Sequence, residues 1–375
     1  MKLLIISADI KIFEKGSAVR ERMIDYGKIF EELHIIVLTL KKDICANERI
    51  CNNVWVYSTS SLNKFFAVSR AKVIGRRIVR EHNFKTNQDF IATQDPFLTG
   101  LVGANLRYMT GIPLQIQVHT DVFNKSFVSH SLKTMILSAM ARYLLPKATT
   151  IRVVSERIRA SIKATLPQIK CKIVVLPISV NKEEILKAPQ GCNDSIPFFS
   201  KTVLAVGRLE SEKNFDFLIK TWPSILEREP EAGLIIVGSG SQKDKLQSLI
   251  NKLKLHDRVV LAGWQKDIYS YYEMANAFVS TSLFEGYGMA LVEAGIHELP
   301  IITSNAGIVG EILRDKENAL VYEQGNSVSL KECVLTILND KVLSEKISLE
   351  AKRAIDAKLI SWQQYLEEYK NSFKK

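Results

Sequence analysis

Short apolar runs alternate with longer amphipathic segments along almost the whole chain. We predict strands at 2–7, 34–40, 54–58, 90–93, 114–119, 150–154 and 173–176 in the first half, and at 202–206, 233–237, 258–262, 277–281, 301–303 and 319–321 in the second. Most of the intervening segments are long enough for helices. This rhythm is typical of an α/β protein with parallel sheets, and its recurrence predicts two doubly wound domains.

The turn-rich segment KAPQGCNDSIPFFS at 187–200 separates the two series of strands. We therefore divide the chain into a first domain at 1–187 and a second at 188–356. The opening MKLLIISADI lacks the long apolar core and the cleavage site of a signal peptide, so we interpret it as a buried strand. No apolar run in the sequence reaches the length that a membrane span needs.

The charge is unevenly distributed, although 46% hydrophobic and 24% charged residues describe an ordinary soluble globular protein. Residues 1–187 contain 29 Lys and Arg against 15 Asp and Glu, a net charge of +14, whereas the remainder contains 22 against 25. This asymmetry suggests an anionic surface or an acidic partner for the first domain alone. No RRM, KH or helix-turn-helix signature accompanies it, so we do not expect a nucleic-acid partner.

The segment 63–85 carries much of this positive charge. Phe65, Phe66 and further apolar residues interleave there with the six lysines and arginines between Lys64 and Arg80. Two interpretations stay open: a basic amphipathic helix on an anionic membrane face, or a helix packed on the core with its basic side in solvent. A second basic segment, 133–147, is mostly apolar, and we expect it in the core.

The five cysteines are odd in number and scattered, with neither a C-x-x-C pair nor a histidine-rich neighbour. This pattern argues against a disulfide framework and against a zinc site. It fits a protein of the reducing cytosol.

Cations and a glycine follow the strand predicted at 202–206. Arg208 offers a planar fork of donors, Lys213 a point charge, and the next helix start adds backbone amides. Together they suit a diphosphate. The alternative is a surface loop in which Glu210 and Glu212 neutralise these cations.

Other strand ends carry weaker candidates, because α/β sheets bind ligands beyond the carboxyl ends of their strands. Gly238 in VGSG predicts a tight turn near a ligand, and Trp264 and Ile268 in GWQKDI could lie beside a base or ribose, although Trp264 could equally be packing. His119 ends the strand at 114–119, which favours a role in a cleft. Gly16 either presents amides to a ligand or simply precedes an N-cap serine.

The segment SLFEGYGMALVEAGIHELP at 282–300 holds the densest set of candidates. Glu285 and Glu293 are eight positions apart, about 80° around a helix axis, so they suit two separate contacts rather than a close acid and base pair. The free amides from Gly288 to Leu291 can receive a phosphate. A buried Glu293 without a partner would be costly, which favours a binding role for it.

Three motifs in the second half occur in the order and spacing of one enzyme family. They are G-R-L-x-x-E-K-N at 207–214, V-G-x-G at 237–240 and S-x-x-E-G-Y-G-M-A-L-V-E-A at 282–294, which contains an E-x7-E pair. On these residues the chain resembles the retaining glycosyltransferases of family 4, the glycosyl transferases group 1, which have the GT-B fold. The first half is similar more loosely, through Gly16, QVHTD at 117–121 and VSE at 154–156.

The resemblance implies a role for each matched residue. Arg208 and Lys213 would hold the donor diphosphate, Glu293 the ribose, and Glu285 with the following backbone the donor sugar, while His119 would lie near the reacting sugar. The catalytic positions expected are His119, Arg208, Lys213 and Glu285. The expected donor-binding positions are Gly16, Gly207, Gly238, Trp264, Ile268, Gly286, Tyr287, Gly288, Met289, Ala290, Leu291 and Glu293.

The implied fold consists of two Rossmann-like domains facing across a cleft. The first would bind the acceptor, the second the donor, and the segment 357–375 would cross back to the first. The first loop departs from the family's paired glycines, with Gly16 followed by Ser17. The family is metal-independent, so neither a metal ion nor another cofactor is expected.

The implied reaction is transfer of a sugar from a UDP- or GDP-sugar to an acceptor hydroxyl with retention, with the domains closing to exclude water. The expected acceptor is a glycan or a lipid-linked glycan in cell-envelope polysaccharide or glycolipid synthesis, at the cytoplasmic face of a membrane. Two alternatives are a GT-B nucleotide-sugar epimerase and a non-catalytic protein that binds a nucleotide-sugar or nucleic acid. The base, the sugar and the acceptor cannot be identified from these residues.

Overall fold

The computed structural model describes residues 1–187 and 199–374, which form two compact units. Unit 1 comprises Met1–Ile178 and Trp362–Lys375, and unit 2 comprises Ser179–Ser361. The end of the chain therefore belongs to the first unit. Most of the predicted linker at 187–200 lies outside the described residues.

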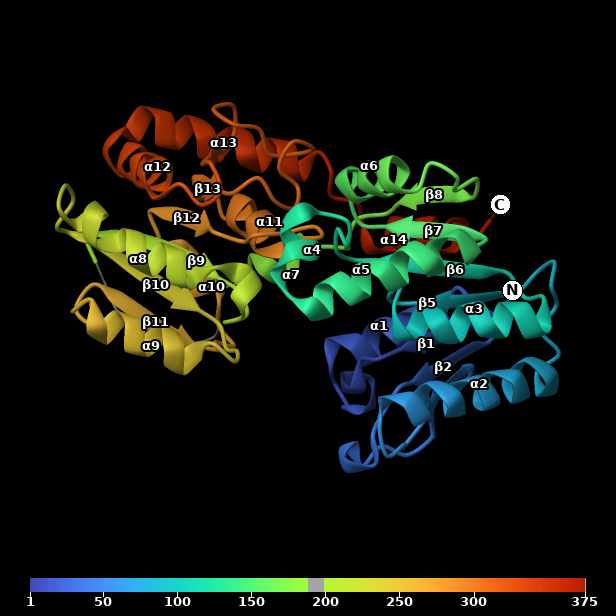
Figure 1. Ribbon diagram of the computed structural model, residues 1–375. Helices are drawn as coiled ribbons and strands as arrows, with labels where there is room; N and C mark the ends of the chain where they lie inside the picture. The colour runs from blue at the N-terminus through green and yellow to red at the C-terminus, as the bar shows by residue number, and fades with distance from the viewer. Residues whose placement is uncertain (188–198, 375) are drawn as a thin grey trace. The chain divides into compact units, whose positions relative to one another are not determined.

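Unit 1 is built on an eight-stranded sheet with the order β3-β4-β2-β1-β5-β6-β7-β8 (Figure 1). Neighbouring strands are parallel except β3, which runs antiparallel to β4. Sequence reasoning missed β3, a short edge strand with polar residues. The strands are β1 Leu3–Ser7, β2 Leu33–Val37, β3 Glu48–Cys51, β4 Val54–Ser58, β5 Phe90–Thr93, β6 Leu114–Val118, β7 Thr150–Val153 and β8 Lys172–Val175.

Helices cover both faces of this sheet. The α-helices are α1 Ala18–Gly27, α2 Lys64–Glu81, α3 Leu98–Thr110, α4 Lys125–His130, α5 Leu132–Leu144, α6 Glu156–Thr165 and α14 Trp362–Asn371, with 3-10 turns at Ile10–Phe13, Lys41–Asp43 and Leu145–Lys147. On one face α3 packs between α2 and α5 (Figure 1).

The alternation of side chains along β6 explains which helix lies on which face. Leu114 points to α3, where it leaves room only for Gly103. The next residue, Gln115, points to the other face and donates to the backbone oxygen of Ser372, 3.0 Å away. Gln117 likewise donates to the hydroxyl of Tyr369 on α14, at 3.1 Å. Helix α14 therefore supplies the partners that these buried glutamines require.

Unit 2 is built on a six-stranded sheet with the order β11-β10-β9-β12-β13-β14, and all neighbouring strands are parallel. The chain moves outward from β9 to β11 and then returns to the other side of β9 as β12. The sheet therefore changes direction between β9 and β12, which is where doubly wound sheets bind ligands. The strands are β9 Lys201–Val206, β10 Ala232–Val237, β11 Val259–Gly263, β12 Ala277–Ser280, β13 Ile301–Thr303 and β14 Leu320–Val321.

The helices of unit 2 bury its core against both faces of the sheet. They are α7 Lys182–Ile185, α8 Phe215–Leu226, α9 Lys243–Lys252, α10 Tyr269–Met274, α11 Met289–Ile296, α12 Ser327–Asn339 and α13 Lys341–Asp356, with a 3-10 turn at Ser211–Lys213. Helix α8 packs between α9 and α12, and α11 packs against α13. Trp222 of α8 is fully buried in the apolar cluster formed with β9 and β10. This core holds the carboxyl ends of the strands in place.

Two helices of unit 1 keep apolar side chains in solvent. On α2 the small face with Ala67 and Ala71 is buried, whereas Phe65 is 77% exposed. On α5, Leu132 and Ile136 are also exposed, at 70% and 52%. The prediction that 133–147 lies in the core is therefore wrong for the outer side of α5. None of the helices in residues 1–187 and 199–374 is long and apolar enough to span a membrane.

Candidate active site

Unit 2 collects most of the predicted site residues at one edge of its sheet. Gly207 follows β9, Gly238 follows β10, Trp264 follows β11, and the turn at 282–288 follows β12. Because these strands are all parallel, their carboxyl ends lie along one edge. The sequence pattern thus placed these residues correctly at the carboxyl edge of the sheet, where α/β proteins bind their ligands.

An ion pair joins the two loops on either side of the point where the sheet changes direction. Lys213 Nζ, in the loop after β9, donates to Glu285 Oε1, in the turn after β12. Each side chain is only 18% exposed, so solvent screens this pair less than a surface pair. The hydroxyl of Ser282 donates to the same carboxylate oxygen at 2.8 Å, and the hydroxyl of Thr281 to the backbone oxygen of Lys213 at 2.8 Å. The structure therefore brings these two predicted catalytic residues together.

The other predicted cation lies differently. Arg208 is 74% exposed on its side chain and pairs with Glu212 at 2.7 Å. That contact is the loop-internal neutralisation considered as the alternative for this segment. Glu210 accepts hydrogen bonds from the amide and hydroxyl of Ser241, which lower its pKa, and the charge of Arg208 lowers that pKa further. Lys213 thus pairs with a residue of the neighbouring loop, whereas Arg208 pairs with a residue of its own loop.

A close contact between two backbone segments explains why the residue after β10 is a glycine. Gly238 has a φ of +147°, and a β-carbon there would lie 1.8 Å from the carbonyl oxygen of Gly207. No side chain fits at that distance. The interpretation of Gly238 as a tight strand-to-helix turn is confirmed, and this contact fixes the spacing of the loops after β9 and β10.

The E-x7-E segment separates its glutamates as predicted. Gly288, at φ +92°, is the N-cap of α11, so Glu285 lies in the preceding turn and Glu293 in the second turn of the helix. The first amides of α11, at Met289 and Ala290, precede the point at which intrahelical bonds begin and are available as donors at this edge. Tyr287 of the turn is buried.

Glu293 has a partner that the sequence did not reveal. The hydroxyl of Tyr272, a fully buried residue of α10, donates to Glu293 Oε2 at 2.8 Å. Burial raises the pKa of Glu293, although the hydrogen bond from Tyr272 opposes that rise. Burial also raises the pKa of Tyr272 well above its usual value, so this group remains a neutral donor. No spacing rule connects two residues 21 positions apart, so sequence reasoning could not find this pair.

The loop after β13 is a further part of the site that sequence reasoning missed. The hydroxyl of Ser304 donates to the backbone oxygen of Ser282 at 2.6 Å. Gly307 has a φ of +61°, and a β-carbon there would lie 2.5 Å from the carbonyl oxygen of Tyr287 and 3.2 Å from Cβ of Glu285. The strand-end rule, applied to the strand at 301–303, would have indicated this loop.

The remaining predicted positions have less specific surroundings. The side chain of Trp264 is 71% exposed, and Ile268 is the half-buried N-cap residue of α10. In unit 1, His119 follows β6 directly, with an exposed side chain. Gly16, at φ +76°, precedes Ser17, whose hydroxyl caps α1 by accepting from the amide of Arg20. The positions of these residues in their loops agree with the sequence prediction.

Comparison with known proteins shows which family the second half of the chain matches. Residues 196–354 match the family model of glycosyl transferases group 1. An uncharacterised glycosyltransferase of Methanocaldococcus jannaschii is 26% identical over 96% of this chain and 94% of its own length. The capsular polysaccharide biosynthesis glycosyltransferase CapM of Staphylococcus aureus is 25% identical over 78% and 79% of the two chains. The similarity to these relatives thus extends well beyond the matched domain.

Among solved structures, HepE of Anabaena in complex with UDP and glucose superposes with a TM-score of 0.72 at 17% identity, over 99% of both chains. At this identity the likeness establishes the fold. Two Rossmann-like units in one chain, with the motifs of the second at its ligand edge, agree with that fold. Residues 196–354 thus match the glycosyl transferases group 1, and the chain as a whole has the GT-B fold.

Proposed function

We propose that this chain transfers a sugar from a UDP- or GDP-sugar to an acceptor hydroxyl with retention of the anomeric configuration, without a metal ion in the reaction. The ion pair between Lys213 and Glu285 is the observation that carries this proposal. It places a cation and a carboxylate together where a doubly wound sheet binds its ligand. A nucleotide-sugar needs both groups, a cation for its diphosphate and an acceptor for its sugar hydroxyls.

The chemistry follows from where charge develops. As the glycosidic bond to the donor breaks, negative charge accumulates on the departing diphosphate. Lys213, together with Arg208 and the first amides of α11, stabilises that charge. Before the donor binds, Glu285 and Glu212 hold the two cations by ion pairs. The donor exchanges these contacts for its own, and Glu285 is then available to the sugar.

The relatives support a substrate class for each unit. HepE was solved with UDP and glucose, and CapM is named for capsular polysaccharide synthesis. On that basis we assign donor binding to unit 2 and binding of a cell-envelope glycan or glycolipid acceptor to unit 1.

The test begins with a screen of UDP-, GDP- and ADP-sugars for thermal stabilisation and slow hydrolysis by the wild-type protein. With the donor identified, Lys213→Ala and Glu285→Ala should each lower transfer by about 10²-fold or more. Lys220→Ala is the matched control, since Lys220 forms an exposed pair with Asp216 on α8. Full transfer activity in both site variants would refute the proposed site. NMR of the product decides retention, and chelator-resistant transfer is the expected result for a reaction without metal.

We also propose that unit 1 binds an anionic membrane surface through α2 and α5. Phe65 and Phe66 stand exposed beside the cations of α2, and Leu132, Met135 and Ile136 form an exposed stripe on α5. Exposed apolar residues next to clustered cations match the interface of an anionic bilayer. The net charge of +14 in residues 1–187 adds long-range attraction to such a surface.

Flotation with vesicles tests this surface. Wild-type protein should float with anionic vesicles at low salt, and much less with neutral vesicles or at high salt. The double substitution Phe65→Ser and Phe66→Ser should reduce flotation, whereas Val328→Ser, at an exposed apolar position of unit 2, should not. Flotation that ignores lipid charge, or that survives the double substitution, would contradict the assignment.

A further inference from the structure

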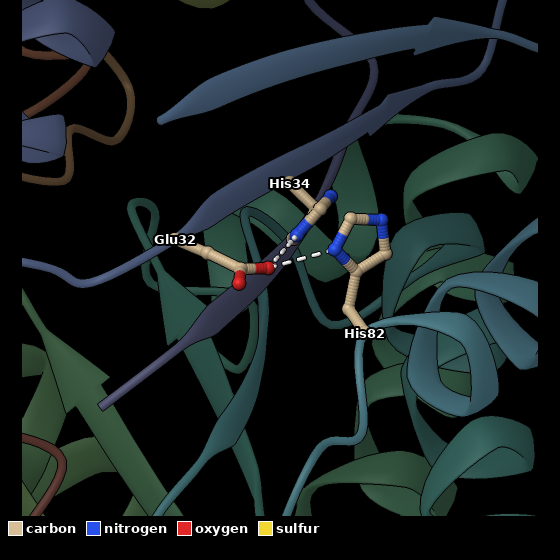
Figure 2. Close-up of side chains that lie close together, drawn as sticks. All are labelled: Glu32, His34 and His82. Atoms are coloured by element: carbon tan, nitrogen blue, oxygen red, sulfur yellow. Dashed lines mark hydrogen bonds and ion pairs between the residues drawn. The ribbon is translucent and has the colours of Figure 1, made fainter. Parts of the chain in front are cut away.

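Unit 1 contains a cluster of metal-ligating side chains far from the strand ends discussed above. Glu32 immediately precedes β2, His34 lies within β2, and His82 is the C-cap residue of α2. One ligand atom from each lies within 4.8 Å of the others. Figure 2 shows one carboxylate oxygen of Glu32 facing a ring nitrogen of each histidine. From this geometry we propose that Glu32, His34 and His82 form a binding site for a divalent transition-metal ion of the zinc type.

The distances fit such an ion with little movement. Glu32 Oε2 lies 3.0 Å from His34 Nε2 and 2.8 Å from His82 Nδ1. With metal–ligand distances of about 2.0–2.1 Å, neighbouring ligand atoms of a tetrahedral zinc ion are about 3.3 Å apart. Two of the three separations are thus near that value. The third closes by rotation of His82, which is partly exposed at a helix end.

The surroundings of His34 resemble those of a metal-bound histidine. Its side chain is fully buried, and its ring stacks on Trp55 with centroids 4.7 Å apart. The second ring nitrogen, Nδ1, lies 3.1 Å from the hydroxyl of Tyr57. A hydroxyl can donate or accept, so Tyr57 accommodates either tautomer of His34. When an ion takes Nε2, the proton moves to Nδ1 and Tyr57 accepts it, which is how ligating histidines are usually oriented.

The same cluster limits which ion it takes. Two imidazoles and one carboxylate suit zinc-type ions and lack the oxygen ligands that Mg²⁺ and Ca²⁺ require. Lys2 Nζ forms an ion pair with the other carboxylate oxygen, Glu32 Oε1, at 2.9 Å, which leaves Oε2 to the ion but adds a nearby positive charge. We therefore expect moderate affinity and a fourth position open to water.

The location indicates a structural role. Lys2 and Glu32 precede β1 and β2, so the cluster lies at the amino ends of the strands, opposite the edge at which α/β sheets bind their ligands. A bound ion would connect the start of β2 to the end of α2. Its removal is therefore expected to change the stability of unit 1 and to leave transfer chemistry unaffected. No sequence pattern indicated this cluster, because His82 is 48 positions from His34.

Zinc binding to untagged, chelator-treated protein tests the site. Wild type should bind one Zn²⁺ through this cluster in equilibrium dialysis, and its thermal midpoint should rise by several degrees in excess Zn²⁺. In His82→Asn and His34→Gln the side-chain amide puts an N–H group where the ring nitrogen facing Glu32 was. Both variants lose the imidazole that would bind the metal. Each should fold without metal, bind at least tenfold more weakly, and lose the thermal shift.

His256→Gln is the matched control, because His256 is an exposed histidine beside Asp257. It should bind zinc like the wild type. The proposal fails if the wild type binds no zinc, or if both cluster variants bind it as well as the wild type does, since the ion would then sit on cysteines or other histidines. If the three side chains serve only as a hydrogen-bonded link, the wild type will bind no zinc.

Discussion

Glu285 and Glu293 are eight residues apart in one motif, yet their surroundings differ in kind. Glu285 lies in a turn, where it pairs with a cation from another loop and accepts from Ser282. Glu293 lies inside a helix, where a neutral tyrosine hydroxyl is its hydrogen-bond partner. The first carboxylate pairs with a cation that the substrate can draw away. The second is held where burial disfavours its ionised form.

The difference indicates how one segment can contact two parts of a donor. When a charged pair opens, its cation can turn to a diphosphate and its carboxylate to sugar hydroxyls, so the contacts are exchanged at small cost. A buried carboxylate with a neutral donor keeps most of its accepting capacity for ribose hydroxyls, and its free energy improves when they arrive. Helix α11 fixes the distance between the two, so the spacing of the motif matches that of sugar and ribose in our proposal.

The sharpest test of this comparison is kinetic and uses the same substitution at both positions. Glu285→Gln should lower kcat by about 10²-fold, because Glu285 pairs with Lys213 and, in our proposal, contacts the reacting sugar. Glu293→Gln should chiefly raise the KM for the donor, by about tenfold, since ribose contacts are made equally in the ground and transition states. Steady-state kinetics with varied donor separates the two effects.

The opposite pattern, with kcat lost at Glu293 and KM raised at Glu285, would reverse the assignment. Equal effects on both parameters at both positions would remove the distinction altogether. Asp216→Asn on the surface of α8 controls for general effects of removing a carboxylate.

Much of this arrangement could be predicted from the sequence. Parallel strands buried on both faces read as apolar runs, so those at 54–58, 90–93 and 301–303 were located to the residue. The edge strand β3 was missed because it is only four residues long and begins with the charged residues Glu48 and Arg49. The outer side of α5 was misjudged because periodicity shows that a helix has an apolar face but not what covers it.

Positions in the candidate site could be predicted where the local sequence determines the backbone conformation. The strand-end positions of Gly207 and Gly238 and the turn before α11 follow from glycines and caps. The partners of each group did not follow, because they are set by tertiary contacts. Tyr272 reaches Glu293 and Lys213 reaches Glu285 from segments 21 and 72 positions away. The metal-ligating cluster in unit 1 was beyond reach for the same reason.

A second test compares the rigidity of the turn around Glu285 with that of the helix around Glu293. It uses one glycine in each place, Gly307 and Gly295. Gly307→Ala should destabilise unit 2 by about 2 kcal/mol, because the new β-carbon meets the carbonyl of Tyr287 at a positive φ that alanine disfavours. Gly295→Ala should change stability by less than about 1 kcal/mol. Its β-carbon meets only the end of Ile355, which can rotate, and alanine is the better helix former.

Thermal and denaturant unfolding of the two variants measure this difference. Gly307→Ala should also lower transfer, since the same contact displaces the turn that carries Glu285. If the two alanine variants are equally stable, the turn around Glu285 adapts to a new β-carbon as easily as the helix around Glu293 does. The inference that the turn is the more rigid of the two would then be wrong.

The smallest effect expected is a pH-dependent gain in stability from Glu293→Gln. The pKa of Glu293 is raised in the folded protein, with burial as the main cause and the Tyr272 hydrogen bond and the charge of His297 opposing it. The folded state therefore binds this proton more tightly than the unfolded state does. The stability that Glu293 contributes is present below its unfolded pKa and is lost as the pH rises through its folded pKa.

Glutamine does not titrate, and its amide oxygen can still accept from Tyr272. The variant should thus match the wild type in acid and become more stable than it as the pH rises. Unfolding free energies of both proteins across the acid-to-neutral range give the difference curve. A curve that falls with rising pH would mean that the folded protein stabilises Glu293 as a carboxylate, and that the two glutamates do not differ as we infer. A rise together with weaker donor binding would show that the wild type keeps a destabilised carboxylate here for its ligand.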